Sequence, residues 1–533
     1  MPGALQSSGS LSVAVAASRV LGLVRESLYS RLIGAGALAD AYSVAFRIPN
    51  LLRDLLAEGA LSSAFVPTFT ASLVQEDRER AHRLADLALA GLLLLTGALG
   101  LLGAVFAEEL VGLMTSGWNH AKIVEAASLT RILMPLMTLV SVGAVWTGML
   151  NAQRRYLPPA YAPALFNVVS VVVGVGLWLA GLDARHAILG WSIGTLAAGG
   201  AQTFMLLPPR WRLGYRPRLR LAGLLTHPGV RRIVTLMLPA IIGIAAVQIN
   251  VFVNTRFAAS LGDGSVAQIE FAFRIFYLPI GMFGVALATI TTTQVSEEAA
   301  RGDRSGLIGK TSEGLSALWM LTTASMVGLC ALAEPIVALI YEGGKFTHAD
   351  TLAVAAILRA YALGLVPYSM VKIVAPAFYA IDRPRLPLIA SLTAVAVNIG
   401  FNAATYQTLG TPGLALGTSL GMLFNVVLLR IFFRRTVGTL ARPGRWRELG
   451  WLALANLAMA AALLLGWYAA AQGLARLALT RPLDTLALIA AVTLLVGLGF
   501  AVFVGVLRAG DFPGSAALAR LPAGLWRRIR RRR

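Results

Sequence analysis

The sequence predicts an all-α integral membrane protein with about 14 transmembrane helices, arranged as two pseudo-symmetric six-helix lobes around a central cavity plus two extra C-terminal helices. Three observations predict this class. The 533 residues are 57% hydrophobic and only 13% charged, with a mean hydropathy of +0.72, whereas soluble proteins carry about 25% charged residues. Apolar segments long enough to cross a bilayer recur along the whole chain. Motifs of the first half also return in the second half.

The expected spans are apolar segments of about 20 residues, the length that crosses a bilayer as a helix. The second and eighth are long enough to be bent or to extend beyond the bilayer. The spans fall near residues 11–33, 41–73, 84–107, 125–150, 159–180, 187–207, 231–255, 268–296, 312–332, 351–379, 387–405, 411–433, 449–472 and 483–508.

The loops that follow even-numbered spans are rich in arginine. These loops and the C-terminal tail hold roughly 29 lysines and arginines, against about 6 on the other side, so the positive-inside rule places both termini in the cytoplasm. The loops account for the net charge of +21. We therefore expect contact with acidic phospholipid head groups and no nucleic-acid partner. The basic segments are 78–83, 153–155, 210–220, 301–304, 383–385, 434–447 and 527–533.

Internal repetition divides the chain into two lobes. The AFR motif at 45–47 returns at 272–274, the loop at 152–161 resembles the loop at 380–389, and the offsets are about 227 to 232 residues. An even number of helices in each lobe gives both the same topology, a parallel repeat that encloses a central cavity. The expected parts are an N-lobe (1–208), a basic cytoplasmic linker (209–230), a C-lobe (231–436), the last two spans (437–510) and a basic cytoplasmic tail (511–533).

Arginines within the first, second and eighth spans are the candidate substrate ligands. A charge at mid-bilayer costs roughly 2.5–3.5 kcal/mol on insertion scales, so these side chains should face a polar cavity. The guanidinium fork donates paired hydrogen bonds and keeps its charge, which suits a phosphate. We therefore expect a pyrophosphate-bearing substrate to bind Arg19, Arg25, Arg53 and Arg274, with Arg47 as a less favoured candidate.

Local ion pairs are the alternative role for these arginines. Glu26 lies two helical turns after Arg19 on the same face. Glu58 lies five residues after Arg53, a poorer fit. Asp40 and Glu58 either gate the cavity by pairing with arginines or lie at helix ends, where an acid suits the helix dipole. The sequence leaves both alternatives open.

Three further basic residues lie in or near expected spans. Lobe packing or snorkelling is the expected role of Arg131 and Arg359. Lys372 lies deeper in its span, and its role is left open.

The chain shows no pattern typical of an enzyme. The five histidines have no metal-ligand spacing, and Gly343-Gly344-Lys345 is followed by Phe346, which does not fit a nucleotide-binding loop. We expect no metal and no cofactor, and transport driven by an ion gradient, the membrane potential or the substrate gradient. A candidate cation site consists of Asn254, Asn398, Asn402 and Thr418, for which interhelical hydrogen bonding is an equally good alternative.

Four stretches resemble signature sequences of the MurJ (MviN) family, and the resemblance covers essentially the whole chain. It implies a member of the multidrug/oligosaccharidyl-lipid/polysaccharide exporter superfamily in the bacterial inner membrane. Such a protein flips lipid II, the undecaprenyl-pyrophosphate-linked peptidoglycan precursor, to the outer leaflet by alternating access. The stretches are SRVLGLVRE (18–26), AFRIPNLLRDLLAEGALSSAFVP (45–67), LPIGMFGVALATI (278–290) and VKIVAPAFYAIDRP (371–384).

The resemblance also assigns roles to residues. The resemblance implies that the last two spans form a groove for the lipid tail. Some relatives carry acids where this chain has Phe273, Asn254 and Asn402, so the coupling ion stays open. The family's cavity arginines fall on Arg19, Arg25, Arg53 and Arg274, and its acids fall on Asp40 and Glu58.

Two other functions remain open at this point. One is export of another polyprenyl-linked oligosaccharide or a drug by the same fold. The other is a membrane scaffold without transport activity that recruits cell-wall synthesis proteins. An integral-membrane transferase is disfavoured because no catalytic cluster is evident.

Overall fold

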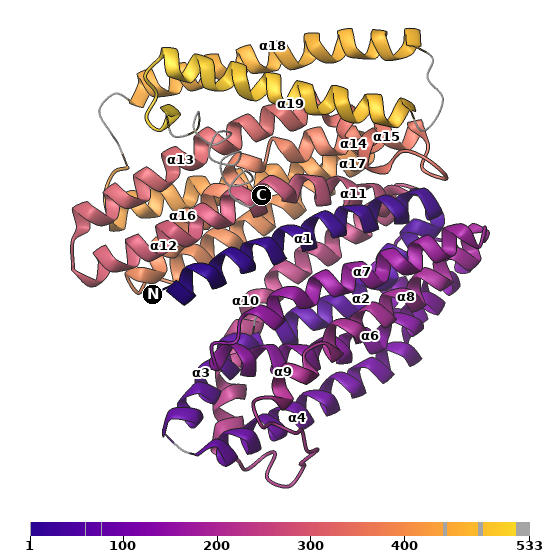
Figure 1. Ribbon diagram of the computed structural model, residues 1–533, viewed down its shortest axis with the longest axis vertical. Coiled ribbons are helices and arrows are strands. Elements are labelled where there is room, and N and C mark those ends of the chain that lie inside the picture. The colour runs from indigo at the N-terminus through magenta and orange to yellow at the C-terminus, as the bar shows by residue number, and fades with distance from the viewer. Residues whose placement is uncertain are drawn as a thin grey trace. The chain divides into compact units, whose positions relative to one another are not determined.

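The structure is a computed structural model that describes residues 2–58, 60–75, 77–440, 445–477, 483–516 and 518. Over these residues the chain forms α-helices joined by turns and loops (Figure 1). The predicted all-α class is confirmed. The helices divide into two compact units: unit 1 contains Met1–Ala267 and Ile340–Thr347, and unit 2 contains Gln268–Leu339 and His348–Arg533.

The helices of unit 1 are α1 (Pro2–Ile33), α2 (Ala37–Arg53), the π-helical segment η1 (Asp54–Glu58), α3 (Ala60–Gln75), α4 (Arg78–Val105), α5 (Ala107–Met114), α6 (His120–Ala152), α7 (Leu157–Leu179), α8 (Ala184–Phe204), α9 (Leu207–Trp211) and α10 (Pro228–Ala259). The next helix, α11 (Ser265–Pro279), begins in unit 1 and continues in unit 2. Unit 2 then holds the π-helical segment η2 (Ile280–Gly284), α12 (Val285–Ala300), α13 (Arg304–Ala331), α14 (Ala333–Tyr341) except its last two residues, α15 (His348–Ala362), α16 (Leu365–Ala380), α17 (Arg385–Thr436), α18 (Arg445–Leu477) and α19 (Leu483–Ala509).

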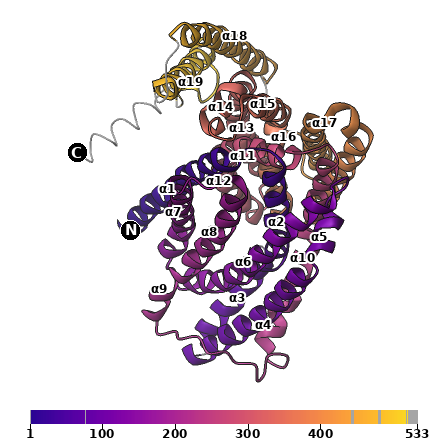
Figure 2. The same ribbon diagram turned by 90° about the vertical axis from the view of Figure 1, so that its right-hand side faces the viewer.

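Helix α6 is the central helix of unit 1 and packs against α2, α3, α4 and α8. Helix α1 packs on α7, which packs on α8 (Figure 2). Membrane helices associate mainly through close packing, which small residues allow. A Cβ atom at Gly148 of α6 would lie 2.9 Å from the Phe65 ring, and one at Gly174 of α7 would lie 2.8 Å from the Trp191 ring. These glycines therefore let the helices approach.

The first part of the expected linker packs into unit 1. Arg210 of α9 is only 2% exposed, and its guanidinium carbon lies 4.1 Å from the centre of the Trp146 ring. The Tyr215 hydroxyl donates a 2.7 Å hydrogen bond to Asp86 of α4. Burial raises the pKa of the Tyr215 phenol, and the hydrogen bond to Asp86 raises it further. Arg210, which the charge pattern placed among the lipid-contacting loop arginines, is instead buried against an aromatic ring.

Unit 2 has a core between α12, α13, α16 and α17, and a second core where α18 and α19 meet α13. Helices α18 and α19 lie side by side in both views (Figures 1 and 2). Helix α17 contains two of the expected spans and has a kink at Gly410, whose φ of 60° and ψ of −149° are not helical. Glycine adopts this backbone conformation without strain.

Eight helices of the described residues are long and apolar enough to cross a membrane, or up to ten if each bent pair forms one span. These helices confirm a multi-span protein. The count of about fourteen spans and the lobe arrangement stay predictions, although each expected range lies mostly in helix over the described residues. Helix α1, for example, contains Arg19, Arg25, Glu26 and Arg31, and charges lower its apolarity.

The second and eighth expected spans are both interrupted. The α2–η1–α3 segment contains π-helical residues at Asp54–Glu58, and the α11–η2–α12 segment contains them at Ile280–Gly284. These are the two spans whose length predicted a bend or an extension. Short π-helical segments within α-helices occur frequently at functional sites.

Candidate functional site

Arg25 of α1 lies in a polar cluster between α1 and α7. Its Nη1 donates a 3.0 Å hydrogen bond to Asn167 Oδ1, and its Nε donates a 3.0 Å hydrogen bond to Glu26 Oε1. Its guanidinium carbon lies 5.3 Å from the centre of the Phe166 ring. The Asn167 amide nitrogen donates to the Ser18 carbonyl at 2.9 Å, so one asparagine of α7 contacts two places on α1. A local ion pair therefore exists for Arg25.

Arg53 ends α2, directly before η1. Its Nη2 atom lies 2.9 Å from Asp54 Oδ1, and Gln248 of α10 donates a 3.3 Å hydrogen bond to Asp54 Oδ2. Sequence reasoning did not select Asp54, because adjacent residues on a helix do not usually face each other. The length of the arginine side chain allows the contact. Glu58, the acid that sequence reasoning paired with Arg53, has its side chain outside the described residues.

Arg47 contacts a different helix. Its Nη1 donates a hydrogen bond to the Thr255 hydroxyl of α10, and Thr255 is buried. Because α2 packs against α10 in this unit, the structure places Arg47 in helix packing. Its lower rank among the candidate substrate ligands stays a prediction.

Asp40 is completely enclosed, with 0% exposure. Its Oδ2 accepts hydrogen bonds from Lys122 Nζ at 2.9 Å and the Gly264 amide at 2.7 Å, and its Oδ1 accepts one from the Ala267 amide at 2.9 Å. Lys122 also lies 2.7 Å from Asp263. One carboxylate of α2 thus holds the start of α6 and the start of α11. Sequence reasoning missed Lys122, although it is among the few basic residues outside the arginine-rich loops.

The two remaining candidate arginines lie in different units. Arg19 is half-buried on α1 in unit 1. Arg274 is half-buried on α11 in unit 2. Arg19, Arg25 and Arg53 therefore belong to unit 1, and Arg274 belongs to unit 2.

The asparagines of the candidate cation site take part in hydrogen bonds. Asn254 donates to Asn250 at 2.6 Å within α10, and Asn398 donates to the Thr418 hydroxyl at 3.3 Å between the two halves of α17. Asn402 is buried. Among the described residues no group of three or more histidine, cysteine or acidic side chains could hold a metal ion. The hydrogen-bonding alternative has direct contacts, whereas a cation site stays a prediction.

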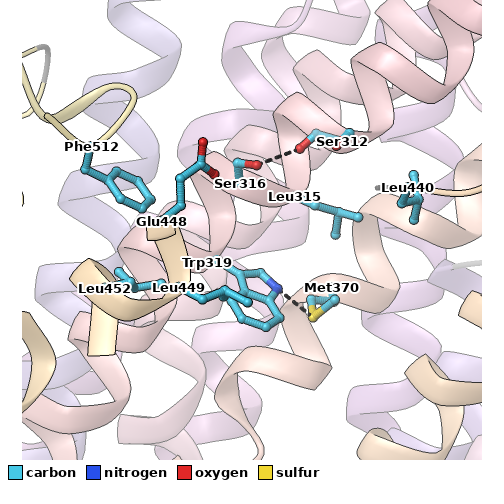
Figure 3. Close-up of a pocket in the computed structure, with 10 residues that line it drawn as sticks. All are labelled: Ser312, Leu315, Ser316, Trp319, Met370, Leu440, Glu448, Leu449, Leu452 and Phe512. Carbon is cyan, nitrogen blue, oxygen red and sulfur yellow. Dashed lines mark hydrogen bonds between the residues drawn. The ribbon is translucent and has the colours of Figure 1, made fainter. Parts of the chain in front are cut away.

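Unit 2 contains a pocket between α13, α16 and the start of α18 (Figure 3). The Trp319 indole nitrogen donates to the Met370 sulfur at 3.0 Å, and Glu448 of α18 also lines the pocket. Most lining side chains are apolar, and the cavity of about 50 Å³ has room for a short hydrocarbon segment. The lining residues are Ser312, Leu315, Ser316, Trp319, Met370, Leu440, Glu448, Leu449, Leu452 and Phe512.

Long apolar helices, two of the expected spans interrupted by π-helical segments, and half-buried arginines within the helices define a multi-pass membrane protein. Solved structures share this fold. A lipid II flippase MurJ in an inward closed conformation is 24% identical, covers 92% of this chain and 98% of its own, and superposes with a TM-score of 0.72. An inward-facing multidrug resistance MATE family transporter of the MOP superfamily is 18% identical, covers 79% and 95%, and gives a TM-score of 0.68.

Sequence comparison gives the family. The model of the MurJ lipid II flippase family matches residues 29–480. A probable lipid II flippase MurJ of Rhizobium meliloti is 32% identical over 510 residues, 92% of this chain and 91% of the relative. A lipid II flippase MurJ of Burkholderia cenocepacia is 32% identical over 494 residues, 92% and 94% of the two chains. The chain belongs to the MurJ lipid II flippase family, a family of transporters, and is a multi-pass inner-membrane protein.

Proposed function

We propose that this protein moves lipid II from the cytoplasmic to the outer leaflet of the bacterial inner membrane by alternating access, for cell-wall synthesis. One observation carries the proposal: a chain of the MurJ family holds arginines inside its membrane helices at Arg19, Arg25, Arg53 and Arg274. Both termini lie in the cytoplasm in this proposal, as the arginine-rich loops require.

The four arginines bind the pyrophosphate and the sugar-peptide head group. Glu26 and Asp54 hold Arg25 and Arg53 through oxygen acceptors at hydrogen-bond distance, and a phosphate offers the same kind of acceptor. When the substrate binds, its phosphate oxygens replace the carboxylate oxygens as hydrogen-bond acceptors of these arginines. Exchange costs less than desolvating a free arginine, because a charge buried without a partner is strongly unfavourable.

Asp40 and Glu58 act as gating residues. Asp40 reaches both α6 and the start of α11, so its hydrogen bonds must break if these helix ends separate during transport. Glu58 lies at the end of η1, where α2 passes into α3. Arg47 supports the packing of α2 on α10.

The prenyl tail stays in the membrane along α18 and α19. The apolar pocket beside α18 supports this placement (Figure 3). An ion gradient or the membrane potential drives the cycle, and Asn254, Asn398, Asn402 and Thr418 stay the candidate cation ligands. Phospholipids surround the helices, and other cell-wall synthesis proteins are candidate partners.

Binding of purified lipid II, measured by native mass spectrometry, tests the assignment. Arg53→Ala and Arg274→Ala should each weaken binding at least tenfold, because a hydrogen bond to a charged group contributes about 1.5–3 kcal/mol. Arg131→Ala is the matched control, because Arg131 is an exposed arginine of α6 that pairs with Glu108 of α5 at 3.0 Å. Equal binding by all three variants and the wild type would contradict the assigned site.

Two alternative functions make different predictions. An exporter of the same fold for a drug or another polyprenyl-linked oligosaccharide should bind its own substrate more tightly than lipid II. A scaffold without transport activity should tolerate loss of the membrane arginines. Growth of cells that depend on Arg53→Ala or Arg274→Ala, with normal protein levels, would favour the scaffold.

A further inference from the structure

Unit 2 contains a cluster of aromatic rings where α11, α15 and α16 meet. The rings of Phe276 and Tyr361 stack with centroids 5.4 Å apart, and Tyr277 meets Tyr368 edge-on at 6.3 Å. Tyr277 is 39% exposed, so the cluster reaches the surface of unit 2. Lys372 lies one turn after Tyr368 on α16, with its ammonium nitrogen 5.5 Å from the centre of the Tyr368 ring.

The position of Lys372 makes its charge costly. Helix α16 runs from Leu365 to Ala380, so Lys372 lies about 10 Å or more from either end at 1.5 Å per residue. This is about two turns, which places the lysine in the middle of the helix and not at an end where snorkelling is usual. Its ammonium lies over the Tyr368 ring, and no carboxylate of the described residues forms an ion pair with it. A charge inside a membrane helix is a sign of function.

Lys372 and Arg274 lie at opposite ends of one tyrosine pair. Arg274 precedes Tyr277 by one turn of α11, so the two side chains share a helix face. Tyr277 contacts Tyr368, and Tyr368 contacts Lys372. Met370, which lines the pocket of Figure 3, projects from the opposite face of α16. The tyrosine pair with its two flanking cations is therefore separate from that pocket.

We propose that Tyr277, Tyr368 and Lys372 form a second subsite for the substrate head group. The subsite rests on the proposed function and adds to the four arginines. Tyrosine presents an apolar face with a polar edge, which fits a sugar ring, and the ammonium of Lys372 binds an anionic group. That group is either the diphosphate or a carboxylate of the peptide, because both offer oxygen acceptors to an ammonium.

Lys372→Gln tests the ammonium by removing its charge at similar length. The probes are intact lipid II, a peptide-free lipid II that retains the disaccharide, and undecaprenyl pyrophosphate. Binding of intact lipid II should weaken about tenfold or more, the loss of one hydrogen bond to a charged group, and Lys372→Arg should restore most of it. Weakening with all three probes assigns the diphosphate, whereas weakening with intact lipid II alone assigns the peptide carboxylate.

Lys310→Gln is the matched control, because Lys310 is a half-exposed lysine that pairs with Glu313 on α13. It should bind all three probes like the wild type. Equal binding by Lys372→Gln and Lys310→Gln would overturn the subsite and leave the proposed function standing. If the wild type binds none of the three lipids, the proposed function fails, and the subsite fails with it.

Tyr277→Leu tests the sugar contact independently. Tyr277 is partly exposed, so this change should not disturb folding, which thermal unfolding can verify. It should weaken binding of the two sugar-bearing lipids several-fold and leave undecaprenyl pyrophosphate unchanged, and Tyr277→Phe, which keeps the aromatic face and loses the hydroxyl, should lose less binding than Tyr277→Leu. Equal loss with all three probes would show that Tyr277 supports the helices and does not contact a sugar.

Discussion

Asp40 illustrates how a single carboxylate connects segments that are distant in the sequence. Three hydrogen bonds from α6 and the start of α11 satisfy its two oxygens, so a carboxylate with 0% exposure remains compatible with a stable fold. Burying a charge is costly unless it is paired and hydrogen-bonded. The three hydrogen bonds together therefore offset the cost of burying the Asp40 carboxylate.

Replacing Asp40 with Asn should lower stability markedly. The change leaves Lys122 with only the mostly exposed Asp263 as its acid partner, and breaking a buried ion pair on one side costs about 3–5 kcal/mol. The thermal unfolding midpoint of the purified variant in detergent measures this loss. Asp183→Asn is the control, because Asp183 is an exposed cap of α8. The explanation is wrong if both variants unfold at the same temperature.

The sequence predicted candidate residues better than it predicted their partners. Arg25, Arg53 and Asp40 were chosen because a charged side chain within the bilayer is unfavourable, and the structure places each of them in a polar contact. The partners Asn167 and Lys122 are 142 and 82 residues away along the chain. A single sequence carries no signal for such pairs, because helix periodicity relates only neighbours within a few turns.

At the scale of elements, a turn between α14 and α15 has a structural role that its sequence motif did not indicate. The Gly343–Phe346 stretch, which does not fit a nucleotide-binding loop, forms a tight turn that closes on itself through two 3.0 Å backbone hydrogen bonds. The Lys345 amide donates to the Arg31 carbonyl at 2.9 Å, and the Ser30 hydroxyl donates to the Tyr341 carbonyl at 3.1 Å. The turn therefore fastens to the end of α1.

Gly344→Ala should detach this turn from α1. Gly344 has a φ of +57°, and a Cβ there would lie 2.3 Å from the Arg31 carbonyl oxygen. Gly302→Ala is a close control, because Gly302 has a φ of +70° but open space around its Cβ position. Both changes strain the backbone by about 1–2 kcal/mol, and only Gly344→Ala adds a clash. Faster amide hydrogen exchange at residues 30–34 and 341–347 in Gly344→Ala alone would be the expected result.

Helix type and position were largely predictable, and helix irregularities were not. Span length identified the two spans that π-helical segments interrupt, but not the residues where they occur, Asp54–Glu58 and Ile280–Gly284. Burial of Arg210 on Trp146 was also missed. Charge patterns treat every loop arginine alike, and only packing distinguishes a buried one.

Orientation in the membrane is a property of the whole molecule, and the single cysteine of the chain makes it measurable. Cys330 is the only cysteine in the sequence, so Cys330→Ser gives a cysteine-free background. A cysteine introduced at Asp183 should react with a membrane-impermeant maleimide on intact cells, and one at Gly302 only after permeabilisation, because the positive-inside rule places the loop at 301–304 in the cytoplasm. The reverse pattern would invert the proposed direction of transport.

Unit 1 is discontinuous in sequence, and this has a consequence during biosynthesis. Its last piece, Ile340–Thr347, follows a stretch of about 70 residues that belongs to unit 2. At a synthesis rate of about 5–20 residues per second, the ribosome needs roughly 4 to 14 seconds to make that stretch. During this interval the end of α1 is already in the membrane without its turn. Unit 1 therefore cannot mature as an independent N-terminal piece, and its completion waits for the first helices of the second half to be made.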